Sequence, residues 1–298
     1  MMPALHPHQQ PGQTPSALSH PISIYMSDHA PRISFIGGGN MASAIIGGLL
    51  RQGWQASQIQ VVEPWAEQRE RLVQQFGLNA LAEPGPALQG SETVVWAVKP
   101  QTFKEAAAQC RAWLSDSLHL SVAAGIRSDS MAGWLDTQRI VRAMPNTPAL
   151  VGQGMTGLFA RSAVTGGDRE RVQTVLTPTG DLLWLDSEQQ LDAVTALSGS
   201  GPAYVFYFLE AMAQAGAELG LSRADAHKLA VGTFVGASAL AKASDEPPEI
   251  LRQRVTSKGG TTYAALTHME TAAVKAHFVQ AMHAAAQRAQ ELGDEFGR

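Results

Sequence analysis

The stretch Ile33-Ser34-Phe35-Ile36-Gly37-Gly38-Gly39-Asn40-Met41-Ala42 decides the fold. Four β-favouring residues run into the pattern G-x-G-x-x-A, after which apolar residues recur at helical spacing. In such a strand–turn–helix unit the first glycine makes the tight turn, the second lets the backbone approach a pyrophosphate, and the alanine keeps the helix close to the strand. We therefore expect dinucleotide binding at Gly37, Gly39, Asn40, Met41 and Ala42. The alternative is a glycine-rich turn that only packing requires.

The alternation of strand and helix patterns continues toward the C-terminus. β-Favouring runs lie at residues 33–36, 59–62, 93–98, 118–122, 140–143, 155–160 and 182–185. Repeated βα units form a mainly parallel sheet with helices on both faces. After about Glu188 only Ala-rich helical patterns remain, and breakers such as Pro202, Gly220 and Pro247-Pro248 mark helix ends. The sequence predicts an α/β protein, with a Rossmann domain at 31–188 whose sheet is doubly wound and an all-α C-terminal domain at 189–298.

The composition limits the class of protein. With 298 residues, 45% of them hydrophobic, the chain can form two domains. Lys and Arg number 22 against 26 Asp and Glu, a net charge of −4, so we expect neither nucleic acid nor a membrane surface as a partner. No apolar run is long enough to span a bilayer. The single cysteine, Cys110, cannot form an internal disulfide, which fits the cytoplasm.

Residues 1–30 differ from the rest of the chain. They are rich in Pro, His, Gln and Ser and show no apolar period, so we expect a disordered N-terminal extension. Met26 begins a segment that runs directly into the first strand. We hypothesise that Met26 is the natural start.

An acidic residue is expected at the end of the second strand, and Glu63 stands there. A carboxylate in this place accepts hydrogen bonds from the ribose hydroxyls of NAD and repels the 2′-phosphate of NADP. In the alternative interpretation Glu63 points to solvent and Arg69 or Arg71 approaches a 2′-phosphate. The sequence thus predicts NADPH or NADH as the cofactor without choosing between them.

Two further clusters follow predicted strands, where ligands bind in open α/β sheets. We expect Ala97, Val98, Lys99 and Pro100 to line the cofactor crevice, although Lys99 could equally be a surface lysine. The loop Met144-Pro145-Asn146-Thr147-Pro148 is made rigid by its two prolines. Asn146 offers its amide either to the cofactor or to the backbone.

The C-terminal region contains the stretch Thr256-Ser257-Lys258-Gly259-Gly260-Thr261-Thr262. A glycine-rich loop flanked by hydroxyls and running into a helix offers backbone N–H groups and hydroxyls to one small anion. The pattern is typical of a carboxylate or phosphate cradle. An ordinary helix N-cap with glycines for the turn is the alternative.

Five segments together resemble the pyrroline-5-carboxylate reductases, in order and in spacing. They are residues 35–42, 97–100, 141–148, 198–204 and 257–262, and the resemblance covers nearly all of residues 32–292. It implies a Rossmann domain followed by a helical dimerisation domain. It also implies reduction of L-1-pyrroline-5-carboxylate by NAD(P)H, the last step of proline synthesis, with the substrate held by the loop from Ser257 to Thr262. Interlocked dimers, with decamers as a further assembly, are implied as well.

The sequence departs from that family in three places. Lys258 stands where the substrate loop commonly has proline. An asparagine that often precedes the segment at 97–100 is replaced around Glu83-Pro84-Gly85. The usual acid before the substrate loop falls on Asp245 or on the adjacent Glu246.

The implied chemistry asks little of the side chains. The nicotinamide transfers the hydride, so the protein must hold two carbons close together and stabilise charge. Backbone N–H groups at Gly260, Thr261 and Thr262, together with Ser257, would bind the substrate carboxylate. The Thr262 hydroxyl, our candidate catalytic group, would reach the ring nitrogen, and Asp245 would favour the iminium. Water or a substrate-borne proton is an equal candidate donor, and we expect no metal.

Two other functions fit parts of the pattern. A β-hydroxyacid dehydrogenase would need a helix lysine beside a glycine-rich motif, and none of Lys228, Lys242, Lys258 and Lys275 has that setting. A non-catalytic dinucleotide sensor would keep the first glycine turn but would not need the loop at 257–262.

Overall fold

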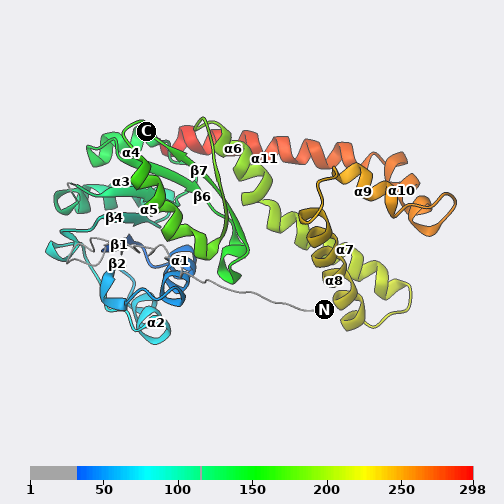
Figure 1. Ribbon diagram of the computed structural model, residues 1–298, viewed down its shortest axis with the longest axis horizontal. Helices are drawn as coiled ribbons and strands as arrows, with labels where there is room; N and C mark the ends of the chain where they lie inside the picture. The colour runs from blue at the N-terminus through cyan, green and yellow to red at the C-terminus, as the bar shows by residue number, and fades with distance from the viewer. Residues whose placement is uncertain (1–31, 115, 298) are drawn as a thin grey trace, which may run out of the picture. The chain divides into compact units, whose positions relative to one another are not determined.

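The sheet of the protein has eight strands (Figure 1). We describe a computed structural model of residues 32–114 and 116–297; the expected extension and Met26 lie outside these residues. The strands are β1 (Ile33–Ile36), β2 (Ile59–Val62), β3 (Ala80–Leu81), β4 (Thr93–Trp96), β5 (Leu118–Ser121), β6 (Ile140–Met144), β7 (Gly154–Ala160) and β8 (Gly180–Trp184). Their order in the sheet is β3-β2-β1-β4-β5-β6-β7-β8.

The prediction of a mainly parallel sheet is confirmed. The first six strands in sheet order, β3-β2-β1-β4-β5-β6, pair in parallel. Strand β7 runs antiparallel to β6, and β8 runs parallel to β7. The reversal follows from the short connection between β6 and β7, which holds only the 3₁₀-helix Thr147–Val151. A crossover between parallel strands needs about a dozen residues or more.

Helices cover both faces of the sheet, as predicted. One face is covered by α1 (Asn40–Arg51), α2 (Ala66–Phe76) and α5 (Gly166–Leu176), the other by α3 (Pro100–Cys110) and α4 (Ser128–Leu135). The four residues of β1 are all buried, Phe35 toward the first face and Ile36 toward the second. Burial on both sides explains why its sequence is a continuous β-favouring run.

One predicted strand is too long, and one strand was missed. The run at 93–98 forms a strand only as far as Trp96, and Pro100 already begins α3. Proline fits the first helical turn because its missing N–H would have no helical partner there. The two-residue strand β3 was not predicted, because Ala80 and Leu81 form no run long enough to show a period of two.

From α6 onward the described chain contains helices and no strand. They are α6 (Gln190–Val194), the π-helix Thr195–Gly199, α7 (Gly201–Glu218), α8 (Arg223–Lys242), α9 (Pro248–Arg254), α10 (Thr261–Thr271) and α11 (Val274–Phe296). The predicted boundaries hold: Gly220 has a φ of +99° after α7, and the Ser222 hydroxyl caps α8 by accepting the N–H of Asp225 at 3.0 Å.

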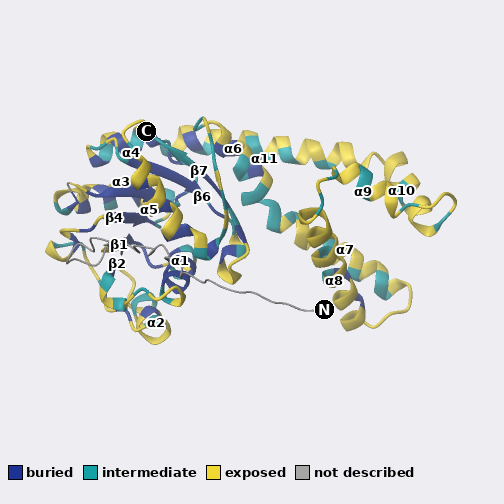
Figure 2. Ribbon diagram, viewed as in Figure 1, coloured by how far each residue is buried: buried dark blue, intermediate teal, exposed yellow. Residues whose placement is uncertain are grey.

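These C-terminal helices bury little of their own apolar surface. Within α7 to α11 the only buried residues are Ala226, Ala230, Ala289 and Gly293, and α8 and α10 are mostly exposed in Figure 2. Several large apolar side chains are exposed: Phe206 is 63% exposed, and Tyr207 and Leu240 are exposed even more. A helical region of this kind needs a partner surface to cover it. None of the described helices has the length and apolar composition of a membrane span.

Largely buried ion pairs join the α/β region to the residues at 188–192, around the start of α6. Arg142 on β6 pairs with Glu188 at 2.7 Å, and Glu188 also accepts the N–H and the hydroxyl of Ser128 at 2.6 Å each. Arg127 makes two hydrogen bonds to Asp192 on α6, of 3.1 and 2.9 Å. Charges that lose water in this way persist because each is paired.

Candidate active site

The glycine turn lies where the strand order reverses. Strands β2 and β4 flank β1, and Ile36 pairs with Trp96, so the carboxyl ends of β1 and β4 lie side by side. Gly37 has a φ of +94°, and a Cβ there would lie 2.6 Å from the Ala97 carbonyl oxygen. Two of the predicted cofactor segments therefore meet at the switch point, where open α/β sheets bind their ligands.

The first turn of α1 has unused N–H donors. Gly39 is its N-cap and forms no side-chain cap bond, and the first turn has no acidic residue. The first helical bond runs from the Ser43 N–H to the Gly39 carbonyl, so the N–H groups of Asn40, Met41 and Ala42 have no partner within the helix. A Cβ on Gly39 would meet open space. These residues fit a pyrophosphate, which this chain would hold through the helix N-terminus.

Glu63 follows β2 and is only 8% exposed, so the interpretation in which it points to solvent is wrong. Its Oε2 accepts the Gly38 N–H at 2.8 Å, and its Oε1 accepts the Trp65 N–H at 3.0 Å. The carboxylate is thus attached to the glycine turn itself.

The other predicted crevice residues lie in less constrained places. Ala97 and Val98 are half-buried, and Lys99 is exposed just before Pro100. Val98 packs near the turn, since its Cγ1 would be 3.2 Å from a Cβ on Gly37. No hydrogen bond or ion pair of Lys99 with another described side chain is found, so Lys99 is free to meet a ligand or solvent.

The amide of Asn146 bonds to the backbone, one of the two interpretations left open above. Its Nδ2 donates to the Ser198 carbonyl at 3.0 Å, and its Oδ1 accepts the Met155 N–H at 2.9 Å. Gly199 lies close to Met144, since a Cβ there would be 2.6 Å from the methionine methyl. Asn146 therefore ties the loop after β6 to the π-helix Thr195–Gly199.

The loop before α10 is a tight turn. The Gly260 N–H donates to the Ser257 carbonyl at 3.0 Å, and Gly259 has a φ of +75°. Lys258 occupies the second position of this turn, a position that favours proline. The turn keeps its hydrogen bond although lysine stands there.

Gly260 is the N-cap of α10, without a side-chain cap bond and without an acid in the first turn. The hydroxyls of Thr261 and Thr262 are exposed and bond to no other described residue. Together with the free N–H groups of this turn they can bind one carboxylate.

The structure separates the two candidate acids. Glu246 Oε1 accepts a hydrogen bond of 2.6 Å from Arg254 on α9. Asp245 is exposed and has no ion pair within residues 32–114 and 116–297. Of the two carboxylates, Glu246 is engaged in an ion pair and Asp245 faces solvent.

Within one chain the loop before α10 does not meet the glycine turn. α11 has 23 residues and is therefore about 34 Å long. Its N-terminal end packs against α10, whereas Leu292 near its C-terminal end contacts Gly125 beside the sheet (Figure 1). No hydrogen bond or ion pair among the described residues joins Thr262 to the glycine turn.

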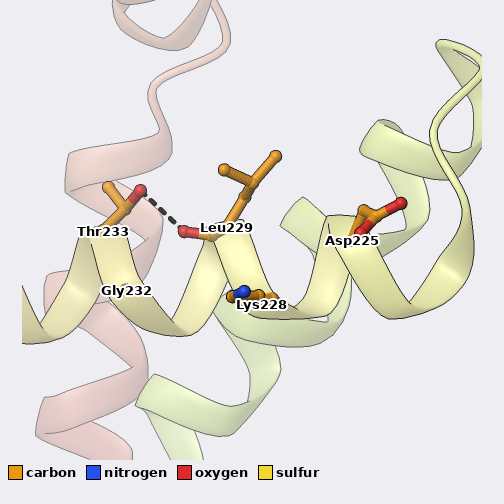
Figure 3. A pocket seen from close by; sticks show the side chains of 5 residues that line it. All are labelled: Asp225, Lys228, Leu229, Gly232 and Thr233. Carbon is orange, nitrogen blue, oxygen red and sulfur yellow. Dashed lines mark hydrogen bonds between the residues drawn. The ribbon is translucent and has the colours of Figure 1, made fainter.

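Two cavities lie elsewhere. One, of about 600 Å³, runs along α8 beside Asp225, Lys228, Leu229, Gly232 and Thr233 (Figure 3). Its Thr233 hydroxyl donates to the Leu229 carbonyl of the same helix, at 2.8 Å. The other, of about 430 Å³, lies at the amino ends of β1 and β4 beside Arg32 and Trp54. Neither includes a predicted site residue, and no described cluster of His, Cys, Asp and Glu side chains could hold a metal ion.

Sequence reasoning missed two contributors to the site. Gln68 on α2 donates from Nε2 to the Gly38 carbonyl at 2.6 Å and so fixes the middle of the turn. The Ser198 carbonyl of the π-helix Thr195–Gly199 accepts the hydrogen bond from Asn146, and π-helical turns are frequent at functional sites. Gln68 could have been predicted as a polar residue on the face of α2 that meets the turn. No local sequence pattern indicates the π-helix.

The chain was compared with known proteins. The family model described as pyrroline-5-carboxylate reductase dimerisation matches residues 188–292, and one described as NADP oxidoreductase coenzyme F420-dependent matches residues 32–125. The pyrroline-5-carboxylate reductase of Pseudomonas aeruginosa is 44% identical over 270 residues, covering 90% of this chain and 99% of the relative. That of Haemophilus influenzae is 42% identical over 87% of this chain and 97% of the relative.

Solved structures agree in fold. The pyrroline-5-carboxylate reductase of Coxiella burnetii has a TM-score of 0.83 and 36% identity, covering 89% of this chain and 99% of that one. The Plasmodium falciparum pyrroline carboxylate reductase, solved with NADP bound, has a TM-score of 0.80 and 28% identity, covering 88% and 98%. This chain therefore belongs to the pyrroline-5-carboxylate reductase family.

Proposed function

We propose that the glycine turn of one subunit binds NADPH or NADH while the loop at 257–262 of a second subunit binds the substrate. The reaction is that of the family: the enzyme reduces the C=N bond of L-1-pyrroline-5-carboxylate and forms L-proline. The observation that carries the proposal is the pair of uncapped helix N-termini, at α1 and α10, each with a glycine N-cap and no acid in its first turn.

The cofactor residues act by binding and orienting. Gly39, Asn40, Met41 and Ala42 offer N–H groups to the pyrophosphate, and Gly37 keeps this turn against Ala97. Val98, Lys99 and Pro100 line the crevice next to them, and Asn146 holds the loop after β6 in place. When bound, the dinucleotide supplies the hydride for the imine carbon.

The substrate residues act on the carboxylate and on the ring nitrogen. Thr261 and Thr262 offer N–H groups to the carboxylate, whereas the Gly260 N–H already bonds to the Ser257 carbonyl, and the Ser257 hydroxyl lies beside Gly260. The Thr262 hydroxyl donates to or accepts from the ring nitrogen, and Asp245 stabilises the positive charge of the iminium. Because the imine can arrive protonated, no strong side-chain acid is required.

The two halves of the site come together across a homo-oligomer. The exposed apolar residues of α7 to α11 supply a surface for a second copy, which agrees with the dimerisation model that matches 188–292. A symmetric dimer then forms two equivalent sites. We propose the division into domains at residue 188, since β8 ends at Trp184 and α6 begins at Gln190. Decamers and the cytoplasm are further proposals that rest on the sequence.

The direct test is an assay of the purified chain. Mixed with L-1-pyrroline-5-carboxylate and NADH or NADPH, it should lower the absorbance of the reduced nicotinamide and form proline in equal amount. Nicotinamide oxidation without proline, or neither, would refute the function.

A further inference from the structure

Glu63 is fixed more firmly than a ribose-binding carboxylate needs to be. Its backbone N–H donates to the Leu81 carbonyl on β3 at 2.8 Å. Its two carboxylate oxygens accept separate main-chain N–H groups, from Gly38 and from Trp65. With backbone and side chain both held, Glu63 cannot turn away from a ligand that binds at the turn.

The fixed carboxylate still has acceptor sites to offer. A carboxylate has about four lone-pair sites, and the bonds from Gly38 and Trp65 use two of them. Gly38 directly precedes Gly39, whose Cβ direction is open to a ligand. The ribose next to a pyrophosphate at Gly39 would therefore place its hydroxyl donors against Glu63.

A 2′-phosphate would be placed badly at this carboxylate. It adds about −1.5 to −2 charges near neutral pH and its oxygens accept hydrogen bonds, so it offers Glu63 repulsion and few donors. Moving Glu63 aside would break its bonds to both N–H groups and leave that of the buried Gly38 without a partner.

The nearby cations do not offset this repulsion. Nη1 of Arg69 donates to the carbonyls of Glu63 and Pro64, at 2.9 and 2.6 Å, and so is held against the backbone behind the carboxylate. Arg71 is exposed two residues further along α2. Helical residues two apart do not share a face, so Arg71 is directed away from the side on which Arg69 meets Glu63.

We infer that this enzyme selects NADH over NADPH and that Glu63 is the residue that selects. The inference rests on the proposed binding of the dinucleotide at the glycine turn. It assigns one of the two cofactors left open above.

The test measures binding, without substrate, by isothermal titration of the full chain with NADH and with NADPH. We expect the dissociation constant of NADH to be lower by about tenfold or more. Glu63→Gln should reduce the ratio of the two dissociation constants about tenfold, so that they become nearly equal. Glu67→Gln is the matched control, because Glu67 is an exposed carboxylate in the first turn of α2 and should leave the ratio unchanged.

Arg69→Gln separates the two explanations of cofactor choice. We expect it to change both affinities by the same factor, because Arg69 bonds only to the loop backbone. A loss confined to NADPH would make Arg69 a phosphate ligand and overturn the inference.

ADP-ribose and its 2′-phosphate provide a second pair of probes. They contain no nicotinamide, and they test the wild-type chain, so the result does not depend on whether a variant folds. Wild-type chain should bind ADP-ribose more tightly. Equal binding of the two, or tighter binding of the phosphorylated form, would refute the inference and leave the function standing. Failure to bind any of the four probes would refute the proposed function itself.

Discussion

Gly37 and Ala97 are in such close contact that a Cβ on the glycine would lie 2.6 Å from the alanine carbonyl oxygen. Gly39, two residues on, has no neighbour within 4 Å of the corresponding position. The two glycines of one motif therefore serve different needs. Gly37 is required by the fold, and Gly39 leaves space for the ligand.

Alanine at each position should show this difference. Gly37→Ala places a side chain at a φ of +94°, which costs about 1–2 kcal/mol before the clash with Ala97 is added. We expect its thermal unfolding midpoint to fall by about 4 °C or more. Gly39→Ala should cost less than about 1 kcal/mol, because only an N-cap residue changes.

Gly39→Ala should affect dinucleotide binding much more than it affects stability. Gly39→Ala should raise the dissociation constant of the dinucleotide about tenfold or more while its melting midpoint stays near that of the wild type. Calorimetry and titration on the same samples measure both. If the affinity of Gly39→Ala is unchanged, the pyrophosphate does not bind at Gly39.

Thr262→Ala should remove one hydrogen bond to a charged group, worth about 1.5–3 kcal/mol, and lower kcat/KM about ten- to a hundredfold. The affinity for the dinucleotide should stay the same. Thr267→Ala is the matched control, since that hydroxyl donates to the Tyr263 carbonyl of its own helix at 2.8 Å. Wild-type efficiency in Thr262→Ala, or an equal loss in Thr267→Ala, would make the loop a structural cap.

Acid should destabilise the protein through His119. Its Nδ1 accepts the indole N–H of Trp96 at 3.0 Å, and burial, together with the charge of Arg139, lowers the pKa of His119 to about 4. The unfolded chain binds this proton near pH 6.5, so the contribution is complete above about pH 6.5 and is lost as the pH falls toward 4.

Urea unfolding between about pH 7 and pH 4.5 checks this prediction. The slope due to His119 should reach about 1.4 kcal/mol per pH unit, and His119→Gln should flatten it. The loss due to Asp168 falls mostly below this range: against burial, hydrogen bonds from Arg139 and Thr165 lower its pKa from 3.8 to about 2, so the unfolded chain binds this proton only near pH 3.8. A variant with the wild-type slope would assign the effect to other groups.

The β-strands could be predicted because local sequence determines them. β1 and β2 fall on the predicted residues, since strands buried in a parallel sheet are mostly apolar, with one polar residue in each of these two. The direction of β7 could not be predicted from its own residues, because the length of the connection from β6 sets it. The short strand β3 depends on pairing with β2 and has no pattern of its own.

The site was predictable to the same extent. The glycine turn, Glu63 and the loop before α10 are local motifs: Gly37 has the positive φ of a tight turn, and the loop closes with a hydrogen bond from Gly260 to Ser257. Asp245 and Glu246 could not be separated, because Arg254 makes the difference through a contact eight residues along the chain from Glu246. The place of Thr262 relative to Gly39 depends on helix packing and, in our proposal, on a second chain, which no motif encodes.

The ion pair of Arg142 and Glu188 should be important for stability. Their side chains are 8% and 15% exposed. Glu188→Gln leaves Arg142 without a countercharge and should cost about 3 kcal/mol or more. Glu291→Gln, which removes an exposed partner of Arg288, should cost far less, because solvent screens a surface pair.

Denaturant unfolding of both variants measures the difference. Adding Arg142→Met to Glu188→Gln should recover part of the loss, since the unpaired charge is then gone. Similar costs for Glu188→Gln and Glu291→Gln would mean that the buried pair contributes no more than a surface pair.

The central claim is that each active site takes its cofactor turn from one subunit and its substrate loop from another. Mixing chains that carry Gly39→Ala with chains that carry Thr262→Ala, under conditions where subunits exchange, tests it most directly. In mixed dimers one site has both defects and the other has neither, so random exchange should restore about a quarter of the wild-type activity. Activity that stays at the mean of the two separate variants would show that each site is made by a single chain, and would contradict the account.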